Sequence, residues 1–144
     1  MSALCVTLLV VLVSDQAVKL LLRRAIGPDA FGLGPFGTVR MVAGRLWLGR
    51  LGRQSSGAMI LCLWVAAAVP LVIVSTLIPS FRVFAGLVLG GSLSHVVESS
   101  VQGSISDYIC LRFWPAFDLA DLAIAAGAIG ILIETLIVVR EMTS

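Results

Sequence analysis

The chain has 144 residues, of which 59% are hydrophobic and only 12% are charged, and its formal net charge is +2. Soluble globular domains have about 45–50% apolar and about 25% charged residues, and a domain this small has too much surface for its volume to bury such an apolar excess. The small net charge gives no sign of a nucleic-acid-binding surface, and three cysteines without a CxxC pair argue against a zinc or disulfide framework. The composition therefore excludes a soluble domain and favours a lipid environment.

Four segments are long and apolar enough to cross a bilayer as helices, which takes about 20 residues each. They cover residues 3–22, 58–78, 83–101 and 117–139. Pro79 ends the second segment only a few residues before the third begins, so these two helices are expected to be antiparallel neighbours. We therefore predict an all-α membrane protein with four transmembrane helices, forming a single domain over residues 1–144.

Residues 23–57, which follow the first segment, have a different character. They are rich in glycine and proline, and Thr38 to Leu48 includes a short β-prone stretch. We expect a small extramembrane β-rich region here, lying on the membrane surface. Four arginines and one tryptophan of this region suit the headgroup layer: Arg40, Arg45, Arg50, Arg53 and Trp47.

Ionisable residues gather at one end of the predicted helices. Four crossings put both termini on one side of the membrane and the first and third loops on the other. The residues that lie toward this second side are Asp15, Lys19, Glu98, Asp107, Asp118 and Asp121. Because a carboxylate within a bilayer is costly and usually marks function, we predict a functional site at this membrane face.

The spacing of these residues indicates how some of them pair. Asp15 and Lys19 are four residues apart and Asp118 and Asp121 are three apart, so each pair shares a helix face. Asp107 lies in a predicted turn region, residues 103–115, from which it can fold back toward Asp121. Two carboxylates brought close together share one proton and titrate as a unit. An aspartic protease requires this, because one carboxylate takes a proton from water and the other donates one to the carbonyl oxygen.

Two other chemical arrangements have less support. His95 and Glu98 are three residues apart and could contact a metal ion, but the chain has one histidine and offers no clear third ligand. Ser14 and Lys19 could form a Ser–Lys dyad, but they are five residues apart and face different directions on a helix. We therefore predict no metal ion and no cofactor.

Four short segments carry a family resemblance. Residues 90–98 read G-G-S-L-S-H-V-V-E, residues 103–109 read G-S-I-S-D-Y-I, residues 113–121 read F-W-P-A-F-D-L-A-D, and residues 15–19 read D-Q-A-V-K. In order and spacing they resemble the GGALGNxxDR, GxVVDF, FNxAD and DQxxK segments of bacterial lipoprotein signal peptidase, or signal peptidase II. The resemblance covers nearly the whole chain.

This resemblance implies a four-span aspartic endopeptidase of the bacterial cytoplasmic (inner) membrane, a multi-pass protein that cuts signal peptides from prolipoproteins before a lipid-modified cysteine. The family's catalytic aspartates correspond to Asp107 and Asp121, and its exoplasmic β-cradle corresponds to residues 23–57. The implied partners are prolipoprotein signal peptides and membrane lipid, with no nucleic acid. A shell that supports the dyad or binds substrate would consist of Asp15, Lys19, His95, Glu98 and Asp118.

Several positions depart from the family pattern. His95 and Asp118 stand where the family has Asn, Glu98 replaces Asp, and Ser99 replaces Arg. A third carboxylate at position 118 should favour protonation of the dyad, because like charges repel. These replacements leave an alternative open, namely a catalytically impaired paralogue that acts as a structural or assembly subunit of a membrane complex. A proton or cation conductor is disfavoured, since the acids gather at one face instead of crossing the membrane.

The arginines also bear on membrane orientation. Most lie in or beside the first and third loops, so the positive-inside rule predicts that these loops are cytoplasmic. The family resemblance implies the opposite orientation, with the first loop outside.

Overall fold

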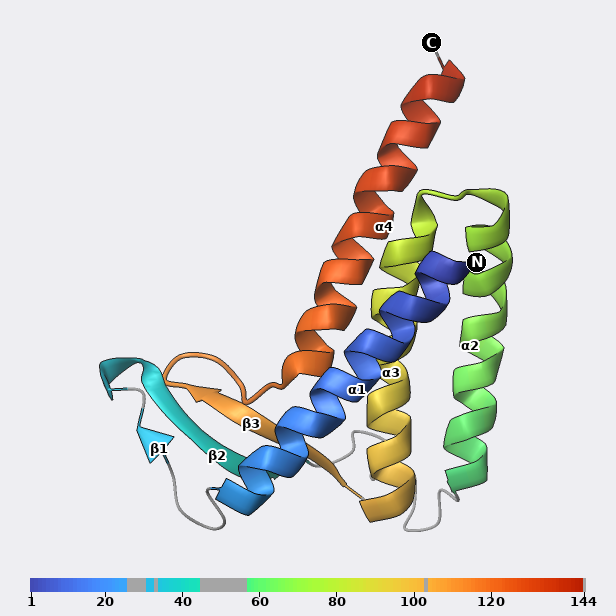
Figure 1. Ribbon diagram of the computed structural model, residues 1–144. Coiled ribbons are helices and arrows are strands. Elements are labelled where there is room, and N and C mark those ends of the chain that lie inside the picture. The colour runs from blue at the N-terminus through green and yellow to red at the C-terminus, as the bar shows by residue number, and fades with distance from the viewer. Residues whose placement is uncertain (26–30, 33, 45–56, 103, 144) are drawn as a thin grey trace.

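The computed structural model describes residues 1–25, 31–32, 34–44, 57–102 and 104–143, and these contain four long helices and a small sheet (Figure 1). The helices are α1 (Ser2–Ala25), α2 (Gly57–Leu77), α3 (Phe81–Gln102) and α4 (Leu119–Thr143). All four are long and apolar enough to cross a membrane. The predicted fold class, four transmembrane helices with a small β-rich region after the first, is therefore confirmed.

Helix α3 is the centre of the bundle, since α1, α2 and α4 all pack against it. Glycines make these approaches close. A β-carbon at Gly90 would lie 2.6 Å from the carbonyl oxygen of Leu8 on α1, and one at Gly91 would lie 2.5 Å from that of Ala120 on α4. Helices in lipid associate mainly through such tight packing of small residues, and this packing fixes the polar ends of α1, α3 and α4 relative to one another.

The connection between α2 and α3 is short, as expected from Pro79. Helix α2 ends at Leu77 and α3 begins at Phe81, whose N–H donates to the carbonyl of Ile78. The two helices are antiparallel neighbours. The α2–α3 turn and both chain ends lie toward one end of the bundle, and the sheet lies toward the other (Figure 1).

The sheet joins both loops at the polar end of the bundle. Its strands are β1 (Phe31–Gly32), β2 (Gly37–Gly44) and β3 (Ile105–Leu111), antiparallel in the order β1-β2-β3, with a 3-10 turn, η1 (Gly34–Phe36), before β2. Gly37 has a φ of 155° and lies so close to β3 that a β-carbon would meet the carbonyl oxygen of Cys110. No other residue type fits this crossing.

The predicted location of Asp107 is wrong. Asp107 was expected in a turn region, but it lies within a strand and pairs with Val42 of β2. The alternation of more and less buried residues along Ile105–Leu111 is typical of a strand. Strand β2 covers the first part of the predicted β-prone stretch, whereas Arg45, Trp47, Arg50 and Arg53 lie outside the described residues.

The chain folds back between β3 and α4, and this return positions the start of α4. Ile109 and Phe117 exchange two backbone hydrogen bonds, of 2.9 and 3.1 Å. The hydroxyl oxygen of Tyr108 accepts a 3.0 Å hydrogen bond from the N–H of Leu119. Asp118 and Asp121 are thereby held beside the strand that carries Asp107.

Candidate active site

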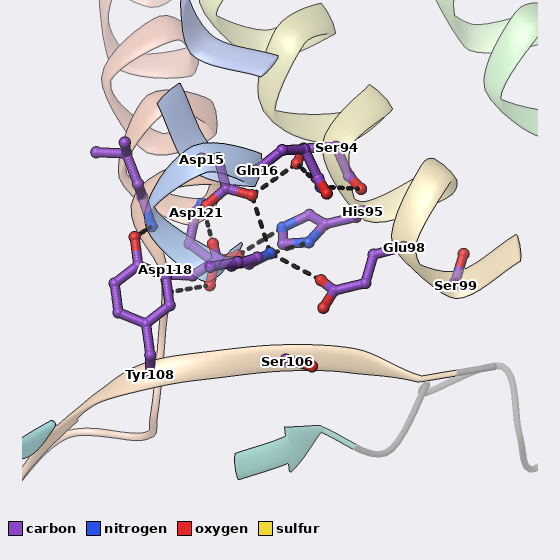
Figure 2. Close-up of polar contacts among 12 residues, drawn as sticks. Asp15, Gln16, Ser94, His95, Glu98, Ser99, Ser106, Tyr108, Asp118 and Asp121 are labelled. Carbon is purple, nitrogen blue, oxygen red and sulfur yellow. Dashed lines mark hydrogen bonds and ion pairs between the residues drawn. The ribbon is translucent and has the colours of Figure 1, made fainter. Parts of the chain in front are cut away.

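Figure 2 shows Asp15, Glu98 and Asp118 turned toward one another, and the ammonium of Lys19 lies among their carboxylates. This ammonium lies 2.9 Å from Asp15, 2.8 Å from Glu98 and 2.5 Å from Asp118, so it joins α1, α3 and the start of α4. All four side chains are at most 1% exposed. The predicted Asp15–Lys19 ion pair is confirmed. The Ser14–Lys19 dyad that the sequence disfavoured has no support here either, because three carboxylates surround the ammonium.

Arg23 completes this network and was not predicted to belong to it. Its guanidinium donates to Oε1 of Glu98 at 2.6 Å, while Lys19 donates to Oε2 of the same carboxylate. Asp15, Lys19 and Arg23 follow one another at intervals of four residues and thus form one stripe on α1. That spacing was a signal in the sequence that could have identified Arg23.

Ser94 and Gln16 form a second contact between α1 and α3 that sequence reasoning missed. The Ser94 hydroxyl donates to Oδ2 of Asp15 at 2.6 Å, and the Gln16 amide donates to the Ser94 hydroxyl at 2.7 Å. Asp15 therefore has a cationic and a neutral donor on its Oδ2, from Lys19 and Ser94. Ser94 precedes Glu98 by one helical turn, and this was the available signal.

The first turn of α4 holds Asp118 and Asp121 in a reciprocal cap. Oδ1 of Asp118 accepts the N–H of Asp121 at 2.8 Å, and Oδ2 of Asp121 accepts the N–H of Asp118 at 3.1 Å. Asp118 is the N-cap residue, since α4 begins at Leu119. Both carboxylates thus satisfy backbone donors that a helix start leaves free. This cap explains why the two acids stand three residues apart.

His95 contacts the same helix start from α3. Its Nε2 lies 3.1 Å from Oδ1 of Asp121, and its Nδ1 lies 3.8 Å from Oδ2 of Asp118. Glu98 is bound by Lys19 and Arg23, whereas the imidazole contacts Asp121, so the structure does not support the His95–Glu98 metal pair that the sequence already disfavoured.

Among the described residues, His95, Asp118 and Asp121 are the group whose arrangement could accept a divalent cation, with ligand atoms within 4.8 Å of one another. The ammonium of Lys19 already lies against Asp118. It supplies the positive charge that a metal ion would bring.

Asp107 lies on β3, close enough for the charges of this group to act on it but without a bond to it. Burial, together with the negative charges of Asp121 and Asp118, raises the pKa of Asp107 to about 6. No hydrogen bond or ion pair joins its carboxyl to the part of the chain that the structure describes. No hydrogen bond joins the carboxyls of Asp107 and Asp121 in the described residues, and each oxygen of Asp121 accepts a hydrogen bond from another group.

Exposure divides the acidic residues into two sets. Asp15, Glu98 and Asp118 are fully enclosed, a position that favours support over contact with a substrate. The Asp121 side chain is 42% exposed, and Asp107 is half-buried. Of the acids predicted to gather here, these two are the ones that a molecule arriving from outside can reach.

Comparison with known proteins gives consistent matches over most of the chain. A family model described as signal peptidase (SPase) II matches residues 7–137. The lipoprotein signal peptidase of Methylorubrum extorquens is 30% identical over 91% of this chain and 84% of its own length. That of Syntrophomonas wolfei is 36% identical over 56% of this chain, and the matched stretch spans 48% of that relative's length.

Solved structures agree on the fold. A bacterial membrane enzyme determined by the in meso method at 1.9 Å matches with a TM-score of 0.79 at 18% identity, covering 94% of each chain. A second, determined by the same method at 2.3 Å, matches with a TM-score of 0.76 at 20% identity, covering 94% of this chain and 88% of that one.

Proposed function

Since the chain belongs to the signal peptidase II family, we propose that it is a membrane aspartic endopeptidase that cleaves signal peptides from prolipoproteins with Asp107, Asp121 and water. The family is one of peptidases, so the reaction class is hydrolysis of a peptide bond. The proposed location is the bacterial cytoplasmic membrane, where such substrates are inserted. The partners are the signal peptide and the surrounding lipid.

One observation carries this proposal. Asp107 and Asp121 are the open carboxyls beside an otherwise enclosed charge network. Peptide hydrolysis by two aspartates needs one carboxylate to take a proton from water and one carboxylic acid to protonate the carbonyl oxygen. Asp107, with a pKa near 6, suits the acid, and Asp121, which accepts two hydrogen bonds, suits the base. A water or a scissile bond between them would bring the two groups into contact.

The enclosed charged residues support the site without taking part in the reaction. Asp15, Lys19, Glu98 and Asp118 hold the ends of α1, α3 and α4 together. The reacting carboxyls, by contrast, lie on β3 and on the first turn of α4. The shell therefore fixes the position of Asp121 and does not touch the substrate.

The test is cleavage by the purified chain in liposomes that contain a synthetic prolipoprotein peptide with a diacylglyceryl-modified cysteine. Mass spectrometry should detect the released signal peptide. Asp107→Asn and Asp121→Asn should each reduce the rate by at least about 100-fold, the usual size of general acid–base catalysis. Glu134→Gln on α4 is the matched control and should retain the wild-type rate. Folded wild-type protein that leaves the peptide intact would contradict the proposal.

A catalytically impaired relative that serves as a subunit of a membrane complex is the second candidate. It is favoured by the replaced family positions at 95, 98, 99 and 118 and by the lack of a bond between Asp107 and Asp121. It predicts that Asp107→Asn has no effect in cells and that a membrane partner co-purifies with both forms. A loss of lipoprotein processing in that variant would exclude this candidate.

A further inference from the structure

His95 approaches both acidic residues at the start of α4. It projects from α3 toward Asp118 and Asp121 (Figure 2), and its side chain is 16% exposed. Its Nε2 lies 3.1 Å from Oδ1 of Asp121. Its Nδ1 is buried and makes no hydrogen bond within the described part of the chain. Asp121 is thus the one hydrogen-bond partner of the imidazole among the described residues.

The two open aspartates therefore differ in what surrounds them. Asp121 receives Nε2 of His95 on one oxygen and the N–H of Asp118 on the other. Donors on both oxygens favour a charged carboxylate, and a cationic donor favours it further. Asp107 receives no such donor from the described residues, and it faces the negative charges of Asp118 and Asp121.

We propose that His95 assigns the roles of the two aspartates: it holds Asp121 as the carboxylate that takes a proton from water and leaves the exchangeable proton on Asp107. This inference rests on the proposed peptidase function. His95 is then a positioning residue, since it acts through Asp121 and does not touch the substrate.

The proton balance of the reaction is complete with these roles. Asp121 takes one proton from water as the water oxygen bonds to the carbonyl carbon, and Asp107 gives its proton to the carbonyl oxygen. The C–N bond of the resulting gem-diol then breaks. Asp121 returns its proton to the leaving nitrogen, and Asp107 takes one from a gem-diol hydroxyl. Both aspartates regain their starting states.

Other charges around the imidazole do not reverse this assignment. Lys19 and Asp15 face the site from α1, Glu98 from α3, Asp118 and Asp121 from α4, and Asp107 from β3. Lys19 already pairs with Asp15, Glu98 and Asp118. Asp118 lies 3.8 Å from Nδ1 of His95 but is paired with Lys19, so the carboxylate that contacts the imidazole most closely is Asp121, at 3.1 Å.

The first measurement is the pH profile of kcat/KM for the wild type and His95→Gln. Glutamine keeps a neutral donor but cannot carry a positive charge. The low-pH side of the profile reports protonation of the base. In the variant it should move upward by about one to three pH units, the usual effect of removing an opposite charge in direct contact with a carboxylate. Ser99→Ala, on the same end of α3, is the control and should leave the low-pH side in place. If His95→Gln lowers kcat/KM equally at every pH and leaves the shape of the profile unchanged, the role of His95 is purely structural and the proposal is overturned.

The second measurement does not depend on turnover. Carbon-13 NMR of aspartate-labelled protein, assigned with Asp107→Asn and Asp121→Asn, reports the protonation of each carboxyl. Asp107 should titrate near pH 6. His95→Gln should change the pH response of the Asp121 signal more than that of the Asp107 signal, because the imidazole contacts Asp121 and not Asp107. If the wild type cleaves nothing, the peptidase function fails but this titration still decides where the proton lies. An Asp121 signal that His95→Gln leaves unchanged would overturn the role of His95.

Discussion

The charge cluster has two halves that use the same kinds of side chain but differ in their surroundings. The enclosed half consists of Asp15, Lys19, Glu98 and Asp118, each at most 1% exposed and each in an ion pair. The open half consists of His95, Asp107 and Asp121, which are partly exposed. One half is built to keep its charges fixed, and the other can exchange protons with water.

Asp118 and Asp121 make this contrast within one helical turn. Both cap the start of α4, and each accepts a backbone N–H from the other. Asp118 is fully enclosed against the ammonium of Lys19, whereas Asp121 is 42% exposed against an imidazole. Chemical type and local geometry are nearly the same, so burial and counter-ion decide which carboxylate supports the fold and which is available for chemistry.

The largest expected effect is on the enclosed half. Lys19→Met removes the one ammonium that three buried carboxylates share, and breaking a buried ion pair in this way costs about 3–5 kcal/mol. The measurement is equilibrium unfolding in mixed micelles. Arg24→Met, an exposed cation on the same helix, should change the free energy of unfolding little. Equal stability of the two variants would refute the idea that Lys19 holds the helices together.

Substitutions of Asp118 should have a smaller effect on stability, and they separate its role as the N-cap of α4 from its ion pair with Lys19. Asp118→Asn keeps an equally good N-cap but loses the charge that faces Lys19, and Asp118→Ala loses both. We expect the alanine variant to be less stable than the asparagine variant by about 1 kcal/mol, the usual value of a helix cap. Both should be less stable than the wild type in the same unfolding assay. Indistinguishable variants would mean that the cap contributes nothing to stability.

How far the sequence predicts this site depends on the range of each contact. The Asp15–Lys19 pair follows from helical spacing, and the gathering of the charges at one membrane face follows from the number and length of the helices. The contact of Lys19 with Glu98 joins residues 79 positions apart, so it depends on how α1 packs on α3. No local pattern contains that information.

One wrong prediction and one disfavoured alternative can be explained by specific contacts. Residues 103–115 begin with glycine and end with proline, which is typical of a turn, and pairing with β2 makes part of them a strand instead. His95 and Glu98 share a face of α3 by spacing, but different partners draw them apart. Glu98 turns to the cations of α1, and His95 turns to the acid of α4.

The smallest expected effect is a pH-dependent one in the open half. The pKa of Asp107 is about 6 in the folded protein against an ordinary value of 3.8. Between these values the folded state binds more protons than the unfolded state, so Asp107 makes the fold progressively less stable as the pH rises from about 4 to about 6.

Asp107→Asn cannot ionise and escapes this loss. The difference in unfolding free energy between variant and wild type should therefore be more favourable to the variant at pH 7.5 than at pH 4. We expect a change of about 1 kcal/mol or less, because water screens a partly exposed charge. The low-pH measurement is the internal control, since position 107 is then neutral in the folded state of both proteins. If Asp107→Asn is more stable than the wild type at neutral pH and also fails to cleave the peptide, the carboxyl of Asp107 is kept for catalysis at the expense of stability. A difference that is the same at both pH values would instead place Asp107 among the ordinary surface carboxylates.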